Sequence, residues 1–141
     1  YSLLWMDLRS EPIVLSFPEI EEGRYYVAQT QDFSTYLLPY IGSRATGNDG
    51  GTYMVTGPDW KGEKPEGIDK IIPSTSQFAF TVYRTQLFNA DDMPNVEKAQ
   101  EGYKVQTLSQ YLGKDAPPAA PKIDFPDWKN QKEPGDDFIS I

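Results

Sequence analysis

The chain has 141 residues, no Cys, no His and a formal net charge of -8. The missing His and Cys remove the commonest general base, the thiolate nucleophile and the usual zinc ligands. The negative charge argues against a nucleic-acid or acidic membrane partner, because phosphate binding needs clustered Lys and Arg. No apolar run approaches the roughly 18 residues that span a bilayer, so we expect no membrane insertion.

Two β-rich runs open the chain. Tyr1 to Arg9 and Pro12 to Pro18 are separated only by Ser10 and Glu11, which predicts that they pair as a hairpin. The next run, Arg24 to Asp32, carries apolar side chains on both faces, as an inner strand of a sandwich does.

The middle of the chain is less regular. Apolar residues in Phe33 to Ile41 recur at helical spacing, but Pro39 interrupts a helix, so we expect an irregular segment or a short helical turn. Thr46 to Thr52 resembles a phosphate cradle only superficially and is interpreted as a hairpin turn leading into a strand to Thr56. The polar stretch from Asp59 to Asp69 predicts a long surface loop that Trp60 anchors.

The last elements before the linker are two strands and a helix. In the strand Phe78 to Leu87, one face carries Phe78, Phe80, Val82 and Arg84. Asp91, Asp92 and Pro94 suit a helix start and Gly102 a helix end, which predicts one short helix near 92–102. Alternation in Tyr103 to Leu112 predicts a final strand.

Together these elements predict an all-β fold. About seven short strands with one brief helix are typical of an antiparallel β-sandwich, immunoglobulin-like as first choice and jelly-roll-like as second.

The two ends indicate an internal fragment of a longer protein. The chain opens without Met inside an apolar strand pattern, and its last residues begin a fresh apolar pattern. We therefore predict a β-sandwich domain over 1–113, a Pro-rich linker over 114–122, and a tail or truncated start of a following domain over 123–141.

Several segments, in this order, resemble one bacterial family, domain of unknown function 1254. They are Tyr1-Ser2-Leu3-Leu4-Trp5-Met6-Asp7-Leu8, Glu11-Pro12-Ile13-Val14-Leu15-Ser16-Phe17-Pro18, Gly23-Arg24-Tyr25-Tyr26-Val27, Ile41-Gly42-Ser43-Arg44-Ala45-Thr46-Gly47, Tyr53-Met54-Val55-Thr56-Gly57-Pro58-Asp59-Trp60-Lys61-Gly62, Arg84-Thr85 and Gln100-Glu101-Gly102-Tyr103. The resemblance covers about residues 1 to 113. It implies an immunoglobulin-like sandwich followed by a separate jelly-roll-like domain, numbered 1214. It also implies a parent protein that is often exported to the periplasm or secreted, and it supplies no catalytic residue.

Three charged residues are the candidate ligand site. Arg24, Asp32 and Arg44 lie near strand ends and loops, and a carboxylate between two guanidiniums could hold an anionic or sugar ligand. The competing interpretation is a structural ion pair that fixes a loop.

Other chemistries find less support in the sequence. Asp7 and Asp32 could act as a glycosidase pair only if folding brought them together. The acidic turn at Glu19, Glu21 and Glu22 and the pair Asn48 and Asp49 match no calcium loop, so we predict no metal and no cofactor.

The leading functional hypothesis is a non-catalytic module with a binding or assembly role in a larger, exported protein. Its expected partners are the missing C-terminal domain of the same protein and, alternatively, a second copy in a homo-oligomer. Whether the parent is an enzyme stays open. The second hypothesis is a carbohydrate or small-molecule binding protein, or hydrolase, whose site forms with the missing domain.

Overall fold

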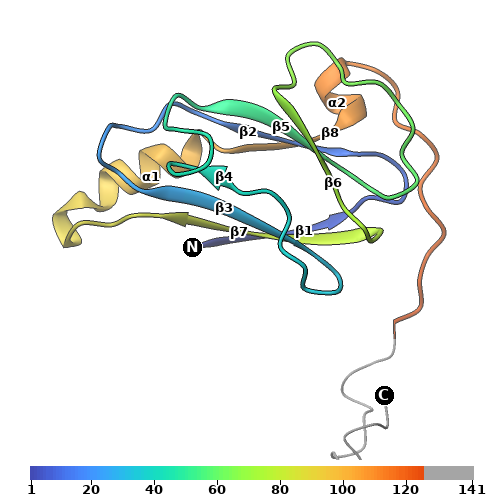
Figure 1. Ribbon diagram of the computed structural model, residues 1–141, viewed down its shortest axis with the longest axis horizontal. Helices are drawn as coiled ribbons and strands as arrows, with labels where there is room; N and C mark the ends of the chain where they lie inside the picture. The colour runs from blue at the N-terminus through green and yellow to red at the C-terminus, as the bar shows by residue number, and fades with distance from the viewer. Residues whose placement is uncertain (126–141) are drawn as a thin grey trace, which may run out of the picture.

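A computed structural model describes residues 1–125 as two four-stranded sheets packed face to face (Figure 1). The first sheet has the order β1-β7-β3-β4 and the second has the order β6-β5-β2-β8. The strands of the first sheet are β1 (Ser2–Asp7), β7 (Phe78–Thr85), β3 (Tyr26–Asp32) and β4 (Ile41–Gly42). Those of the second are β6 (Lys70–Pro73), β5 (Gly51–Thr56), β2 (Ile13–Phe17) and β8 (Lys104–Thr107).

The predicted all-β sandwich is confirmed. The pairings are antiparallel except that of β5 with β6, which is parallel. The long loop from 57 to 69 allows that exception, because a parallel neighbour needs a longer connection than a hairpin gives. The immunoglobulin-like connectivity stays a prediction.

The core between the sheets is built around Phe17. Its ring centroid lies within 6.0 Å of four tyrosine rings that come from both sheets and from the segment before β8. These are Tyr26, Tyr53, Tyr83 and Tyr103. Tilted and edge-on aromatic contacts of this kind stabilise a core beyond their buried area.

A second cluster covers the outer face of the second sheet. Val14, Met54 and Ile68 are buried there, with Trp60 and Tyr111 packed against them. Tyr111 belongs to the short helix α2 (Leu108–Leu112), and Trp60 lies in the loop that was expected to use it as an anchor. That expectation is confirmed, and the central strands β2 and β5 of the second sheet are buried on both faces.

The helix predicted near 92–102 is present as α1 (Met93–Glu101), preceded by the 3-10 turn η1 (Ala90–Asp92). Its capping differs from the prediction, because Asn89 caps η1 and Asp92 makes no side-chain cap. The Asp92 carboxylate is instead committed to a tertiary contact described below.

The predicted hairpin between the first two runs is wrong. β1 pairs with β7, and β2 pairs with β5 and β8, so the two runs lie in different sheets. The Leu8 N–H still donates to Gln77 O and continues the first sheet, before the chain crosses to the second. A short connection is compatible with a layer crossing as well as with a hairpin, and sequence spacing does not separate them.

Two further expectations need correction. The stretch from Thr46 to Thr52 links β4 in the first sheet to β5 in the second, so it is a crossing and not a hairpin turn. The predicted strand from 103 to 112 ends at Thr107, where a capping box with Gln110 starts α2.

The predicted irregular segment 33–41 is irregular up to residue 40, with one isolated bridge between Leu37 and Gln31, and Ile41 begins β4. None of the helices in residues 1–125 has the length and apolar character needed to cross a bilayer. Of the predicted tail 123–141, residues 126–141 lie outside the described part of the chain.

Replacing Phe17 by Ala should lower the free energy of unfolding by about 3–5 kcal/mol, because four aromatic contacts are lost and a cavity remains. Leu3→Ala, at a side chain 66% exposed, is the control and should change it by about 0.5 kcal/mol or less. Urea unfolding of the two variants measures both. Equal losses would contradict the central place of Phe17.

Candidate functional site

Arg24 is a buried structural cation. Its side chain, 2% exposed, donates from Nη1 and Nη2 to the two carboxylate oxygens of Asp92 at 2.8 and 2.7 Å. Nε donates to Glu21 at 2.8 Å, and Nη1 also donates to the Gln86 carbonyl at 2.6 Å. The Phe88 ring lies 4.8 Å from the guanidinium. The Asp92 hydrogen bonds raise the pKa of Arg24, and they hold the pKa of Asp92 well below its usual range. All three nitrogens of Arg24 are therefore occupied within the fold.

Asp32 is far from this ion pair. It ends β3, is 3% exposed, and accepts from the Ser34 and Tyr36 backbone N–H groups at 2.9 Å each. The Thr75 hydroxyl also donates to it. These bonds, the Thr75 hydroxyl first, lower the pKa of Asp32. Asp32 fixes the turn that follows β3, so the predicted carboxylate between two arginines is not formed by Asp32.

Arg44 is exposed on the turn after β4. Its guanidinium lies over the Tyr25 ring at 5.5 Å. Arg24 and Arg44 line one open hollow, but Glu19, Glu22 and Asp49 also line it, which makes it unfavourable for an anion.

A second hollow of about 560 Å³ combines Arg44 with Arg84, a residue that the sequence interpretation did not include. Arg84 lies on β7, and Val27 on β3 stands opposite both Arg84 and Gly42. The alternation of β7 places Arg84 on the same face as Phe78, but only the pairing of β3 with β7 and β4 brings Arg84 and Arg44 to one hollow. The pairing is non-local, and for that reason the sequence did not reveal it.

The first sheet is apolar on its outer face. Along β7, Ala79, Thr81 and Tyr83 point into the core and are buried, whereas the phenylalanines point outward. The buried hydroxyls of Thr30 and Thr81 satisfy each other at 2.8 Å. We call the outward set the aromatic face; it comprises Leu3, Trp5, Phe33, Phe78, Phe80 and Val82.

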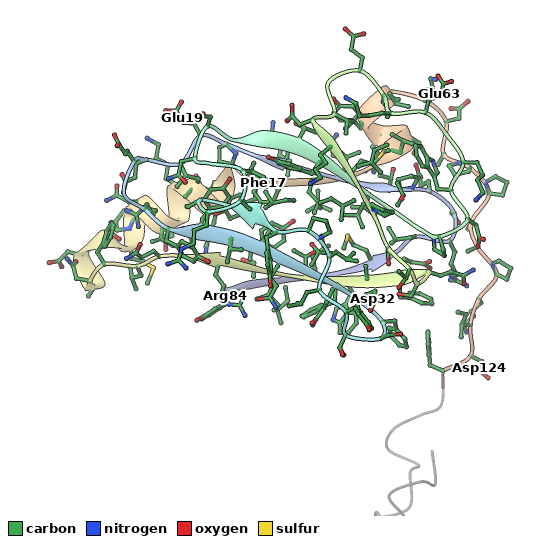
Figure 2. The ribbon with its side chains drawn as sticks, in the orientation of Figure 1. Phe17, Glu19, Asp32, Glu63, Arg84 and Asp124 are labelled. Carbon is green, nitrogen blue, oxygen red and sulfur yellow. The ribbon has the colours of Figure 1, made fainter. Side chains whose placement is uncertain are left out.

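Its members contact one another across strands. Trp5 stacks on Phe80 with centroids 4.6 Å apart, and Phe33 lies 5.9 Å from Phe78. Leu3, Trp5 and Phe33 remain 66%, 69% and 63% exposed. Figure 2 shows Arg84 and Asp32 toward opposite ends of this sheet and Phe17 between the two layers. Contiguous exposed apolar patches are a common feature of interaction surfaces in proteins.

The two carboxylates considered for glycosidase chemistry do not form a pair. Asp7 stands opposite Phe78 and Asp32 opposite Ala79, and consecutive residues of β7 face opposite sides of the sheet. Asp7 is exposed and bonded to Arg9, whereas Asp32 is buried. Within residues 1–125, no group of three or more acidic residues has the arrangement of a metal site.

Arg24→Met should lower the free energy of unfolding by about 3–5 kcal/mol, because the Asp92 carboxylate would stay buried without its partner. Arg44→Gln removes an equal charge from an exposed position and should stay within about 0.5 kcal/mol of the wild type. Urea unfolding at pH 7 checks both, and equal effects would contradict the structural role of Arg24.

Acid should destabilise the fold through Asp92 and Asp32. Because their folded-state pKa values are depressed, their contribution is complete above the unfolded pKa of about 3.9 and is lost as the pH falls through the folded values. The free energy of unfolding should therefore change little from these groups between about pH 7 and 5 and fall below about pH 4. Asp92→Asn should flatten that fall, whereas Asp115→Asn, on the exposed linker, should not. An unchanged acid profile in Asp92→Asn would contradict this assignment.

Comparison with known proteins agrees with this architecture. The family described as protein of unknown function (DUF1254) matches residues 1–107. The crystal structure of the VPA0106 protein from Vibrio parahaemolyticus superposes with a TM-score of 0.83 at 31% identity. The match covers 90% of this chain but only 32% of that protein, so this chain spans about a third of that protein's length. No curated protein matches the chain.

Proposed function

This chain belongs to the DUF1254 family of proteins of unknown function, and on that premise we propose that it is a non-catalytic β-sandwich module of a longer protein. Its aromatic face packs against a further domain of that longer protein. The module has an assembly role, in which it supplies a rigid sheet surface to a partner domain of the same chain.

The observation that carries the proposal is the difference between the two sheets. The second sheet covers its outer face with Trp60, Ile68 and α2, whereas the first sheet leaves Leu3, Trp5 and Phe33 exposed. On the inner face of the first sheet, β3 and β7 carry the small polar residues Thr30 and Thr81. Apolar side chains of a strand usually face the core and polar side chains face solvent. An outward phenylalanine beside an inward threonine reverses that pattern, as is expected on a surface that binds a partner.

The course of the described chain supports this occupant. After α2, residues 113–125 run from the side of the second sheet toward the first (Figure 1). Arg9 Nη1 donates to the Pro121 carbonyl at 2.7 Å, and the Phe125 ring then lies 6.2 Å from Phe78 at the margin of the aromatic face. Phe125, the last described residue, therefore lies beside this surface. The match covers only 32% of the Vibrio relative, so a protein of that length has room for further domains.

Thiol labelling tests the proposal, because the chain contains no native Cys. Leu3→Cys places one thiol on the aromatic face. It should react rapidly with a maleimide in the 141-residue chain and at least tenfold more slowly in the longer parent protein, with any native Cys there replaced. Coverage by the following domain would exclude the reagent.

Glu63→Cys is the matched control, since it lies on the loop over the second sheet and is exposed. Its labelling rate should be the same in both proteins. Equal rates at position 3 in the two proteins would overturn the proposal. Slow, concentration-dependent labelling of position 3 in the 141-residue chain would also overturn it, because a second copy would then cover the face.

A further inference from the structure

The hollow between Arg44 and Arg84 lies at the far end of the first sheet from Asp32. Residues of β3, β7 and the turn around β4 line it: Tyr25, Val27, Gln29, Tyr40, Arg44 and Arg84. Its volume of about 560 Å³ lies within the range of small-molecule sites.

Both guanidiniums at this hollow lack a carboxylate partner among residues 1–125. By contrast, Arg9 and Arg24 each form an ion pair within these described residues. Arg84 Nη1 donates to the Gln29 amide oxygen at 2.7 Å, and Arg44 packs over the Tyr25 ring. Arg44 and Arg84 therefore line the hollow with two positive charges that no ion pair among residues 1–125 neutralises.

The backbone holds the two arginines at a fixed separation. Val27 stands between Arg84 on β7 and Gly42 on β4, which puts these two backbones about 10 Å apart, or two strand spacings. A Cβ at Gly42, which has φ +150, would lie 2.4 Å from the Tyr26 carbonyl oxygen, so only glycine allows this approach.

The turn that carries Arg44 is also tightly bonded. The Ala45 and Thr46 N–H groups both donate to the Gly42 carbonyl at 2.9 Å, and the Thr46 hydroxyl accepts from the Gly42 N–H at 3.0 Å. Arg44 therefore projects from a preorganised backbone, which lowers the entropy lost when a ligand binds.

We propose that this hollow binds a small organic acid of the acidic-sugar class. The guanidinium of Arg84 or Arg44 matches a planar carboxylate with two parallel hydrogen bonds. The rings of Tyr25 and Tyr40, 38% and 46% exposed, offer apolar surfaces for a sugar ring, and their hydroxyls and the Gln29 amide suit sugar hydroxyls. The carboxylates of the neighbouring hollow, Glu22 and Asp49 among them, lie beyond Tyr25 and Arg44 and would exclude the acid from that side. The inference does not depend on what covers the aromatic face.

Titration of the 141-residue chain with D-glucuronate, followed by amide NMR at low ionic strength, tests the site. We expect saturable shifts at Val27, Gly42 and Ala45 with a dissociation constant in the millimolar range. D-Glucose, which lacks the carboxylate, and inorganic phosphate, which lacks the ring, should each bind at least tenfold more weakly.

Arg44→Gln and Arg84→Gln should each weaken glucuronate binding at least tenfold, whereas Lys61→Gln, which removes the same charge from an exposed loop position, should leave it unchanged. Tyr40→Ala keeps both charges and should weaken glucuronate binding while leaving the weaker phosphate binding unaltered; it also serves if Arg84→Gln fails to fold. Absence of shifts, equal binding of glucose, or equal binding of phosphate, which would indicate an adventitious ion only, would each overturn the proposal.

Discussion

The buried ion pair of Arg24 and Asp92 positions the segments on which both proposed surfaces depend. It joins the segment before β3 to the turn before α1, and Glu21 and the Gln86 carbonyl share the same guanidinium. Tyr25 follows Arg24 directly and exchanges hydrogen bonds with Gln86, with its N–H bound to the side chain and its carbonyl to the backbone N–H. The ring that packs under Arg44 is thereby held next to the end of β7. A buried ion pair contributes little net stability compared with apolar packing, so its main effect here is to select one arrangement of three distant segments.

The unequal covering of the two sheets follows from how the chain uses its helices and loops. The 57–69 loop and α2 both lie on the outer face of the second sheet, and their apolar residues bury Val14 and Met54. α1 is tied through η1 to the segment before β3, and among residues 1–125 the outer face of the first sheet receives Phe125 at its margin. A sheet buried on both faces needs apolar residues at successive positions, and β5 has them from Tyr53 to Val55. The side chains of β7 alternate between the two faces of the sheet, but Phe78 and Phe80 point away from the core. Burial inside this sandwich therefore does not explain why the outer face of β7 is apolar.

Local sequence signals predicted the strands well and their pairing poorly. Alternation located the run at 78–87, and Asp, Pro and Gly located the helix near 92–102, because these signals act within a few residues. The prediction of a hairpin between the first two runs was wrong, because consecutive strands of a sandwich can lie in different sheets. Nothing in Ser10-Glu11 specifies in which sheet the second run lies. α2 was accessible from sequence: Thr107 and Gln110 form a capping box, and Gly113 with φ 62 ends the helix, but the preceding alternation outweighed them. Asp92 was recognised as a helix-start residue, although its partner Arg24, 68 positions away, could not be inferred.

The candidate site shows the same division between local and non-local information. Of the three predicted site residues, Arg24 and Arg44 line one hollow. Asp32 does not join them, because it lies at the opposite end of β3. The alternation assigned Arg84 to the correct face of β7, together with Phe78, Phe80 and Val82. The register of β7 with its neighbouring strands then determines which residues surround each of these side chains. The apolar residues of this face lie beside Trp5 and Phe33. Arg84 lines a hollow with Tyr25 and Tyr40. One outward row on a single strand therefore serves both proposed surfaces.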